Sequence, residues 1–111
     1  MEIRVRSVGN VAVIDLKGNL ILRENADELH DKVVQTINGG SIHILINLTE
    51  LVRMDSYGIG IMIKSFKTTK GSNGHLKVCN PTTFVKQVLT IAGLMTLMEV
   101  FDNEVSAISS F

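Results

Sequence analysis

The N-terminal part of the chain alternates between polar and apolar positions. Residues 2–6 alternate strictly, which is typical of an edge strand with one solvent-exposed face. Gly9 and Asn10 then offer a tight turn into the apolar residues 11–16, so the pattern predicts an antiparallel hairpin. Gly18 and Asn19 are expected to end the second strand.

A helical period follows this hairpin. Asn25 and Glu28 have the spacing of a capping box, in which two side chains satisfy free backbone N–H groups at a helix start. Apolar residues then recur on one face of the expected helix until the Asn-Gly-Gly sequence at residues 38–40 ends it. These apolar residues are Ala26, Leu29, Val33 and Ile37.

The middle of the chain predicts a buried strand and a second helix. Residues 42–48 are almost continuously apolar and rich in Ile, which indicates a central strand covered on both faces. A helix is expected from Ser56 to about Thr69, followed by a turn at residues 71–74 and a strand at residues 76–79. The apolar stripe of this helix comprises Ile59, Met62, Ile63 and Phe66.

The last third of the chain completes an alternation of strands and helices. Asn80 is expected to cap a helix that has Pro81 in its first turn and runs to Gly93, and a short strand at residues 97–101 precedes a last helix. We therefore expect a single α/β domain over residues 1–111. Its mixed β-sheet, with an N-terminal antiparallel hairpin and a parallel centre, should be flanked by about four helices.

Composition limits the classes of function. Lys plus Arg and Asp plus Glu number 11 each, so no charge excess favours direct binding to nucleic acid or to an anionic membrane. The one cysteine excludes an internal disulfide, the three histidines are scattered, and we expect neither a metal site nor a cofactor. The first residues lack the pattern of a leader and no apolar run approaches the roughly 20 residues that span a bilayer, so a cytoplasmic protein is expected.

The segment 51–60, Leu-Val-Arg-Met-Asp-Ser-Tyr-Gly-Ile-Gly, holds the candidate site. It is expected in a loop after the central strand, where function gathers in parallel sheets. Either Asp55 or Ser56 can cap the following helix. Gly58 and Gly60 are poor helix formers, and we interpret them as space for a close approach by another backbone or by a partner.

Catalysis by this segment is not expected. A nucleophile elbow has Gly two residues before and two residues after its serine, but Met54 stands at the first of these positions. His30, His43 and His75 remain as candidate bases, although a serine nucleophile also needs an oxyanion hole. No Gly-Lys-Ser/Thr sequence follows that would make a phosphate-binding loop. The segment is therefore interpreted as a binding site and not as that of an enzyme.

Four stretches together resemble STAS domains, and specifically the bacterial anti-sigma factor antagonists. They are Asn-Leu-Thr-Glu-Leu at residues 47–51, Met-Asp-Ser-Tyr-Gly-Ile-Gly at 54–60, Gly-His-Leu-Lys-Val at 74–78 and Ile-Ala-Gly-Leu at 91–94. The resemblance implies a STAS-like fold and a protein that binds an anti-sigma factor with serine kinase activity, thereby freeing a sigma factor. Phosphorylation of Ser56 would abolish this binding, and a phosphatase would restore it.

The resemblance also implies a partner-binding surface, from which the sequence departs at two positions. Ile21 stands where the family usually has an acidic residue, and Tyr57 replaces a small residue after the serine. These departures leave open an alternative, a STAS module that regulates a transport, lipid or secretion system without a sigma factor. Lys64 belongs to a row of lysines that is either a solvated face or a contact for acidic residues of a partner. The expected partner-binding residues are Asn19, Leu20, Ile21, Arg23, Met54, Asp55, Ser56, Tyr57, Gly58, Gly60 and Lys64.

Overall fold

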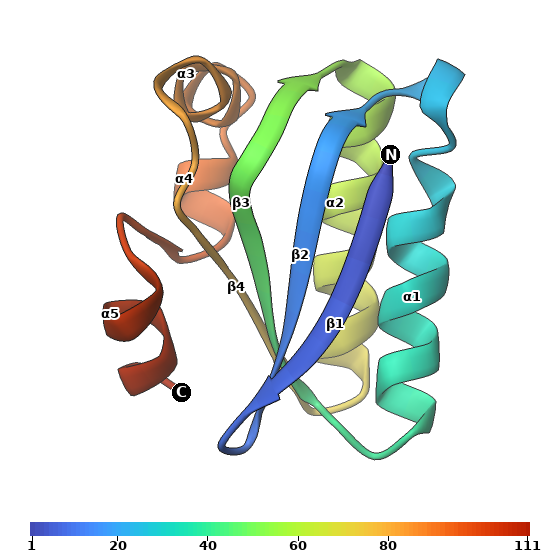
Figure 1. Cartoon of the computed structure of the whole chain (residues 1–111), viewed down its shortest axis with the longest axis vertical. Helices are drawn as coiled ribbons and strands as arrows, with labels where there is room; N and C mark the ends of the chain where they lie inside the picture. The colour runs from blue at the N-terminus through green and yellow to red at the C-terminus, as the bar shows by residue number, and fades with distance from the viewer.

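The computed structural model describes residues 1–111 and contains one five-stranded sheet in the order β1-β2-β3-β4-β5 (Figure 1). The strands β1 and β2 are antiparallel, and each later neighbour in the sheet is parallel to the one before. The mixed sheet and its parallel centre are thus confirmed. The elements are β1 (Glu2–Val8), β2 (Val11–Leu20), the 3-10 helix η1 (Leu22–Glu24), α1 (Asp27–Asn38), β3 (His43–Met54), α2 (Ser56–Gly71), β4 (His75–Cys79), α3 (Thr83–Ile91), α4 (Leu94–Leu97), β5 (Val100–Phe101) and α5 (Glu104–Ser109).

The apolar residues form two hydrophobic clusters, one on each face of the sheet. Ile44, Leu45 and Ile46 of β3 are all fully buried, as expected for a central strand covered on both faces. The larger cluster packs α1, α2, α3 and α4 against the sheet, and Figure 1 shows α2 behind the strands with α1 beside β1. The smaller cluster joins Leu45 to Ala107 of α5 on the other face. Because both faces of β3 are covered, its position in the sheet is fixed by burial.

The strands β2 and β3 are longer than expected. The strand β2 does not end at Gly18 and Asn19 but continues to Leu20, with shifts of register around these residues. Gly18 has a φ of 108°, which favours glycine, and Asn19 and Leu20 pair with Arg53 and Met54. The strands persist because burying Leu20 and Met54 beneath α2 stabilises them. The segment 51–60 is therefore not a loop, since only Asp55 separates β3 from α2.

Two predicted helix caps are wrong. Asn25 and Asn80 have φ values of 56° and 58°, in the left-handed region that Asn tolerates better than most residues. Asn25 ends η1, and α1 begins after Ala26 without a side-chain cap. The start of α3 is capped instead by Thr82, whose hydroxyl accepts a hydrogen bond from Val85 N at 3.2 Å. The short helix α4 was not predicted, because it occupies a single turn.

A charged cluster holds α5 against the face of the sheet opposite α1 and α2. Arg6 of β1 donates hydrogen bonds to both carboxylate oxygens of Asp15, at 2.8 and 3.1 Å, and to the carboxylate of Glu104. Asn47 of β3 donates to Asp15 Oδ1 at 2.7 Å. We call these four residues the Arg6 cluster. Because the cluster joins β1, β2, β3 and α5, it fixes the C-terminal helix to the N-terminal hairpin.

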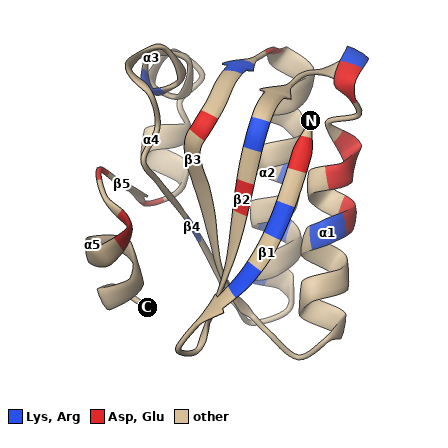
Figure 2. Cartoon of the chain, in the orientation of Figure 1, with Lys and Arg blue, Asp and Glu red and all other residues tan.

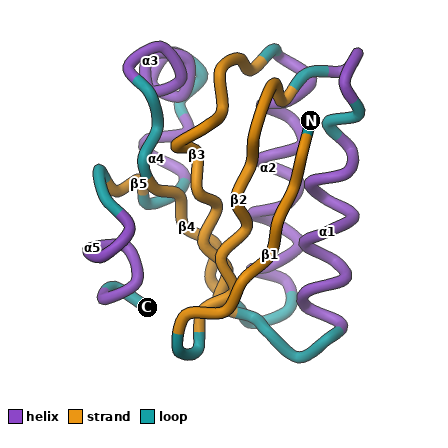
Figure 3. The backbone as a smooth tube through the Cα atoms, viewed as in Figure 1, coloured by secondary structure: helices purple, strands orange, loops and turns teal.

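The connections place one group of segments at a single end of the sheet. Figure 3 shows β2 leading into η1 and β3 leading into α2 at the same end. The charged residues are spread over β1, β2, β3 and α1 with both signs mixed (Figure 2). None of the helices combines the length and the apolar character that crossing a bilayer requires. The end of the sheet at β2 and β3 is where most of the expected site residues meet.

Candidate functional site

Asp55 ties together the three segments that meet at this end. Its Oδ1 accepts a hydrogen bond from Gly58 N at 2.8 Å, which caps α2, and its Oδ2 accepts one from Leu22 N at 3.2 Å. Its own backbone N–H donates to Leu20 O at 3.4 Å. The cap of α2 is therefore Asp55 and not Ser56, a choice that the sequence left open.

Ser56 is the first residue of α2, and its side chain is free. The residue is exposed, and its hydroxyl makes no hydrogen bond within the chain. Asp55 accepts hydrogen bonds from the backbone N–H groups of Leu22 and Gly58 and none from the hydroxyl of Ser56. An exposed hydroxyl without a partner is open to the active site of another protein.

The structure places no histidine beside Ser56. His30 shares a hydrogen bond of 2.9 Å with Thr68, in the last turns of α2. His43 and His75 begin β3 and β4, so they lie at the opposite end of the sheet, with their rings 5.4 Å apart. Because a serine nucleophile needs a base within hydrogen-bond reach, Ser56 lacks the geometry of a hydrolase.

The two glycines of α2 have different surroundings. A Cβ at Gly58 would lie only 1.9 Å from the backbone oxygen of Leu20, whereas one at Gly60 would meet no atom within 4 Å. Gly58 is buried and lets the end of β2 pack directly on α2. The close approach predicted at Gly58 is thus made by the chain's own backbone and not by a partner. Gly60 is exposed, so only Gly60 leaves open space.

Tyr57 connects α2 to the start of α1. Its hydroxyl donates to Asp27 Oδ1 at 2.5 Å, and this hydrogen bond, partial burial and the charge of Asp27 raise the pKa of Tyr57. The side chain is 36% exposed. Tyr57 therefore links α2 to α1 through its hydroxyl and also presents part of its side chain to solvent.

Two expected contact residues are buried. Leu20 is 0% and Met54 is 7% exposed, and both belong to the main core cluster. Neither side chain is positioned to contact a partner, because each packs beneath the surface that α2 and η1 form. Asn19 is half-buried and donates to Glu24 Oε2 at 2.8 Å, which holds the two ends of the connection between β2 and α1 together.

A hollow lies beside Ser56. It is lined by Ile21, Leu22 and Arg23, which follow β2, by Arg53 near the end of β3 and by Asp55 between β3 and α2. Leu22 is 61% exposed, and both arginines are exposed. We call these five residues together with Ser56 the Ser56 surface. Leu22 and Arg53 were not predicted for this site, because only the pairing of β2 with β3 brings them to the same place.

Lys64 lies farther along α2 and is exposed, as are Lys67 and Lys70. Burial and the nearby charge of Lys64 lower the pKa of His30 in α1. Lys64 therefore sits near the neighbouring helix and two turns from Ser56, and its contact with a partner stays a prediction.

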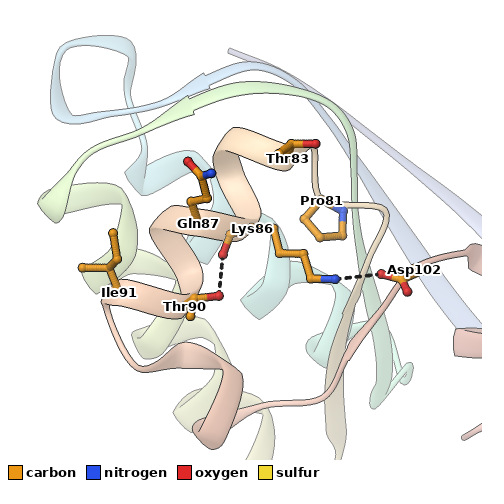
Figure 4. A pocket seen from close by; sticks show the side chains of 7 residues that line it. All are labelled: Pro81, Thr83, Lys86, Gln87, Thr90, Ile91 and Asp102. Carbon is orange, nitrogen blue, oxygen red and sulfur yellow. Dashed lines mark hydrogen bonds and ion pairs between the residues drawn. The ribbon is translucent and has the colours of Figure 1, made fainter.

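A larger hollow of about 580 Å³ lies beside α3, past the carboxyl end of β4 (Figure 4). The ion pair between Lys86 Nζ and Asp102 Oδ1, 3.2 Å long, spans it. None of the expected site residues lines this hollow. Its lining comprises Pro81, Thr83, Lys86, Gln87, Thr90, Ile91 and Asp102.

Comparison with known protein sequences finds a family and a relative. A sequence model of the STAS domain family matches residues 2–107. The anti-sigma F factor antagonist of Paenibacillus polymyxa is 34% identical over 67 residues, which cover 60% of this chain. The match spans 57% of that relative's length, a little more than half.

Comparison with solved structures finds the same arrangement of helices and strands. The anti-sigma factor antagonist SpoIIAA in its unphosphorylated form is 25% identical, with a TM-score of 0.80 over 98% of this chain and 95% of the other. The Bacillus cell fate determinant SpoIIAA in its phosphorylated form is 24% identical, with a TM-score of 0.73 over 98% of both chains. Both likenesses cover nearly every element of the present fold.

Proposed function

Because the chain belongs to the STAS domain family, we propose that it is an anti-sigma factor antagonist that exchanges partners when Ser56 is phosphorylated. In its unmodified form it binds an anti-sigma factor with serine kinase activity through the Ser56 surface. The kinase transfers phosphate to Ser56, the complex dissociates, and a phosphatase restores the binding form. The protein itself has no catalytic part in this cycle.

The observation that carries the proposal is the state of Ser56. Its hydroxyl is exposed and makes no hydrogen bond, while the neighbouring Asp55 takes over the capping of α2. A phosphate on Ser56 therefore breaks no contact of the fold. The likeness to SpoIIAA, whose structure is known in a phosphorylated form, supports the same use of this fold.

Simple electrostatics explains why the phosphate would release a partner. A phosphate adds about −1.5 to −2 charges at neutral pH, and a helix N-terminus tolerates such a charge. A partner that buries the same position must remove the phosphate from water, which costs several kcal/mol unless the ion is well paired. Since about 1.4 kcal/mol corresponds to a tenfold change in affinity, a loss of a hundredfold or more is expected.

Ile21 makes the proposed partner-binding surface apolar at a position where the family usually has an acidic residue. The side chain is half-buried in the hollow, next to the exposed Leu22. An acidic residue at this position would place a negative charge near Ser56 before any phosphate is present. With Ile21 the unmodified surface offers an apolar patch, so the partner is expected to place an apolar side chain there.

The experiment combines modification with binding. The protein is incubated with ATP, magnesium and a purified kinase-type anti-sigma factor encoded in the same genome, and mass spectrometry locates the phosphate. We expect one phosphate, on Ser56, and none in Ser56→Ala. Calorimetry should show at least a hundredfold weaker binding of Ser56→Asp.

A matched control is Ser72→Asp, which adds the same charge at the exposed far end of α2. This variant should bind as the wild type does. If Ser56 stays unmodified while the complex forms, the proposed switch is wrong. If Ser56→Asp loses binding only because its melting temperature collapses, Ser56 has a structural role instead.

A further inference from the structure

The Ser56 surface contains two arginines without an acidic partner. Six ion pairs are present in the chain, and neither Arg23 nor Arg53 belongs to any of them. Both side chains are exposed and line the same hollow as Asp55. A guanidinium group in this state is available to bind an anion.

The acidic side chains of the neighbouring segments are already engaged. Asp55 accepts backbone hydrogen bonds from Gly58 and Leu22, Glu24 accepts one from Asn19, and Asp27 accepts one from Tyr57. The residues in these contacts come from the end of β2, η1, the start of α1 and the start of α2. Their neutral donors leave the carboxylates charged, but none of these carboxylates forms an ion pair with Arg23 or Arg53.

The two arginines come from different segments and line the same hollow as Asp55, the residue that precedes Ser56. Arg53 pairs with Asn19 at the end of β3, and Arg23 lies in η1. The hydrogen bond from Leu22 N to Asp55 Oδ2 fixes η1 to the start of α2. Since Ser56 follows Asp55 directly in the chain, the shared hollow brings two long, exposed arginine side chains to the neighbourhood of a group carried by Ser56.

We propose that Arg23 and Arg53 bind the phosphate on Ser56 within the same chain. This inference rests on the proposed function, because that function supplies the phosphate. Guanidinium groups match the oxygens of a phosphate in forked hydrogen bonds, which are stronger than bonds between neutral groups. The phosphate thus draws two exposed arginines away from the surface that the unmodified protein offers to its partner, and it fixes η1 to α2 at the same time.

The test uses protein that carries phosphoserine at position 56, installed during translation so that no kinase is needed. Titration followed by ³¹P NMR gives the second pKa of the phosphate, which is about 6 for a free phosphoserine. A nearby positive charge favours the dianion, so we expect a pKa lower by about 0.5–1 in the protein. Arg53→Gln and Arg23→Gln should each raise the phosphate pKa, and the double variant should raise it further, leaving only the effects of the helix N-terminus and of Asp55.

Lys64→Gln is the matched control, because it removes one positive charge from an exposed position two turns along α2. It should leave the phosphate pKa within about 0.1 of the parent value, since exposed charges that far apart are largely screened. Circular dichroism checks that each variant is folded, and the two single variants test the inference separately if the double variant is not.

An equal phosphate pKa in the parent and in the arginine variants would overturn the inference. That result would leave the proposed function intact, because the kinase and binding experiments do not depend on how the phosphate is held. Conversely, a lowered pKa that requires both arginines would stand even if the tested anti-sigma factor failed to modify Ser56.

Discussion

Arg6 and Arg53 have the same side chain but lie in two regions of the molecule with different roles. In the Arg6 cluster the guanidinium group binds Glu104 and Asp15, and these contacts raise the pKa of Arg6 above its ordinary value. On the Ser56 surface Arg53 has no acidic partner and is exposed. A charge that is paired inside the chain stabilises the fold, whereas an unpaired charge on a fixed surface is available to a ligand or a modification.

The largest effect is expected where the Ser56 surface rests on the core. Gly58→Ala would place a Cβ 1.9 Å from Leu20 O, so β2 and α2 must move apart. We expect the free energy of unfolding to fall by about 3 kcal/mol, measured by urea denaturation followed by circular dichroism. Gly60→Ala is the control and should raise it by about 0.5–1 kcal/mol, because Gly60 faces open space in a helix. Equal effects of the two changes would contradict the contact with Leu20.

The next largest effect compares the contributions of Arg6 and Arg53 to stability. Arg6→Gln leaves Asp15 and Glu104 without their shared partner, and we expect a loss of about 1–2 kcal/mol in unfolding free energy, since the pairs are partly screened by solvent. Arg53→Gln should change the same quantity by less than about 0.5 kcal/mol. A larger loss for Arg53→Gln than for Arg6→Gln would show that the comparison is wrong.

A smaller effect distinguishes Asp55, which caps α2, from its neighbour Ser56. Asp55→Ala removes the acceptor for Gly58 N and Leu22 N, and it should lower the free energy of unfolding by about 1 kcal/mol. Ser56→Ala removes no hydrogen bond and should be nearly neutral. Thermal unfolding of the two variants side by side measures the difference. A destabilised Ser56→Ala would assign part of the capping to the serine.

The smallest expected effect is the pH dependence of the Arg6 cluster. Burial raises the pKa of Asp15, but the hydrogen bonds from Arg6 and Asn47 and the charges of Arg6 and Arg4 together outweigh burial, so the pKa lies below its ordinary value. The stabilisation is therefore present above about pH 3.9, the unfolded pKa, and is lost as the pH falls through the lower folded pKa. We expect Asp15→Asn to be less stable than the wild type by under 1 kcal/mol at pH 7, with the gap closing toward pH 3.

Urea denaturation at several pH values measures this gap. Asp31→Asn serves as the control, because Asp31 is exposed and belongs to no ion pair. A gap that stays constant from pH 7 to pH 3 would show that the carboxylate of Asp15 does not gain its stability from ionisation.

The sequence predicted secondary structure well where a run of several residues has one clear pattern of polar and apolar positions. The alternation of residues 2–6 and the apolar run at 42–48 each predicted a strand in its correct place in the sheet. Caps were predicted less well, because a single polar residue fits more than one local conformation. Asn25 and Asn80 satisfy the rules for a helix cap, yet both adopt the left-handed conformation that their connections require.

Within the site, the sequence located Ser56 but not its surroundings. Leu20, Ile21 and Leu22 are similar apolar residues in a row, yet the first is buried, the second half-buried and the third exposed. Their order depends on where β2 stops pairing with β3, which no local pattern records. The glycine at position 58 likewise signalled a close approach, but not that Leu20 makes it.

The sequence by itself thus determined the order of the longer strands and helices, the resemblance to STAS domains and the serine at the start of α2, because these depend on residues close together in the chain. Only the tertiary structure decided which side chains share a surface and which charges are paired. Arg6 binds Glu104 across 98 positions of sequence, whereas Arg53 lines a hollow with Ile21 and Leu22 and forms no ion pair. Contacts between such distant residues follow from the register of the sheet and the packing of its helices. Burial of the whole core sets both the register and the packing.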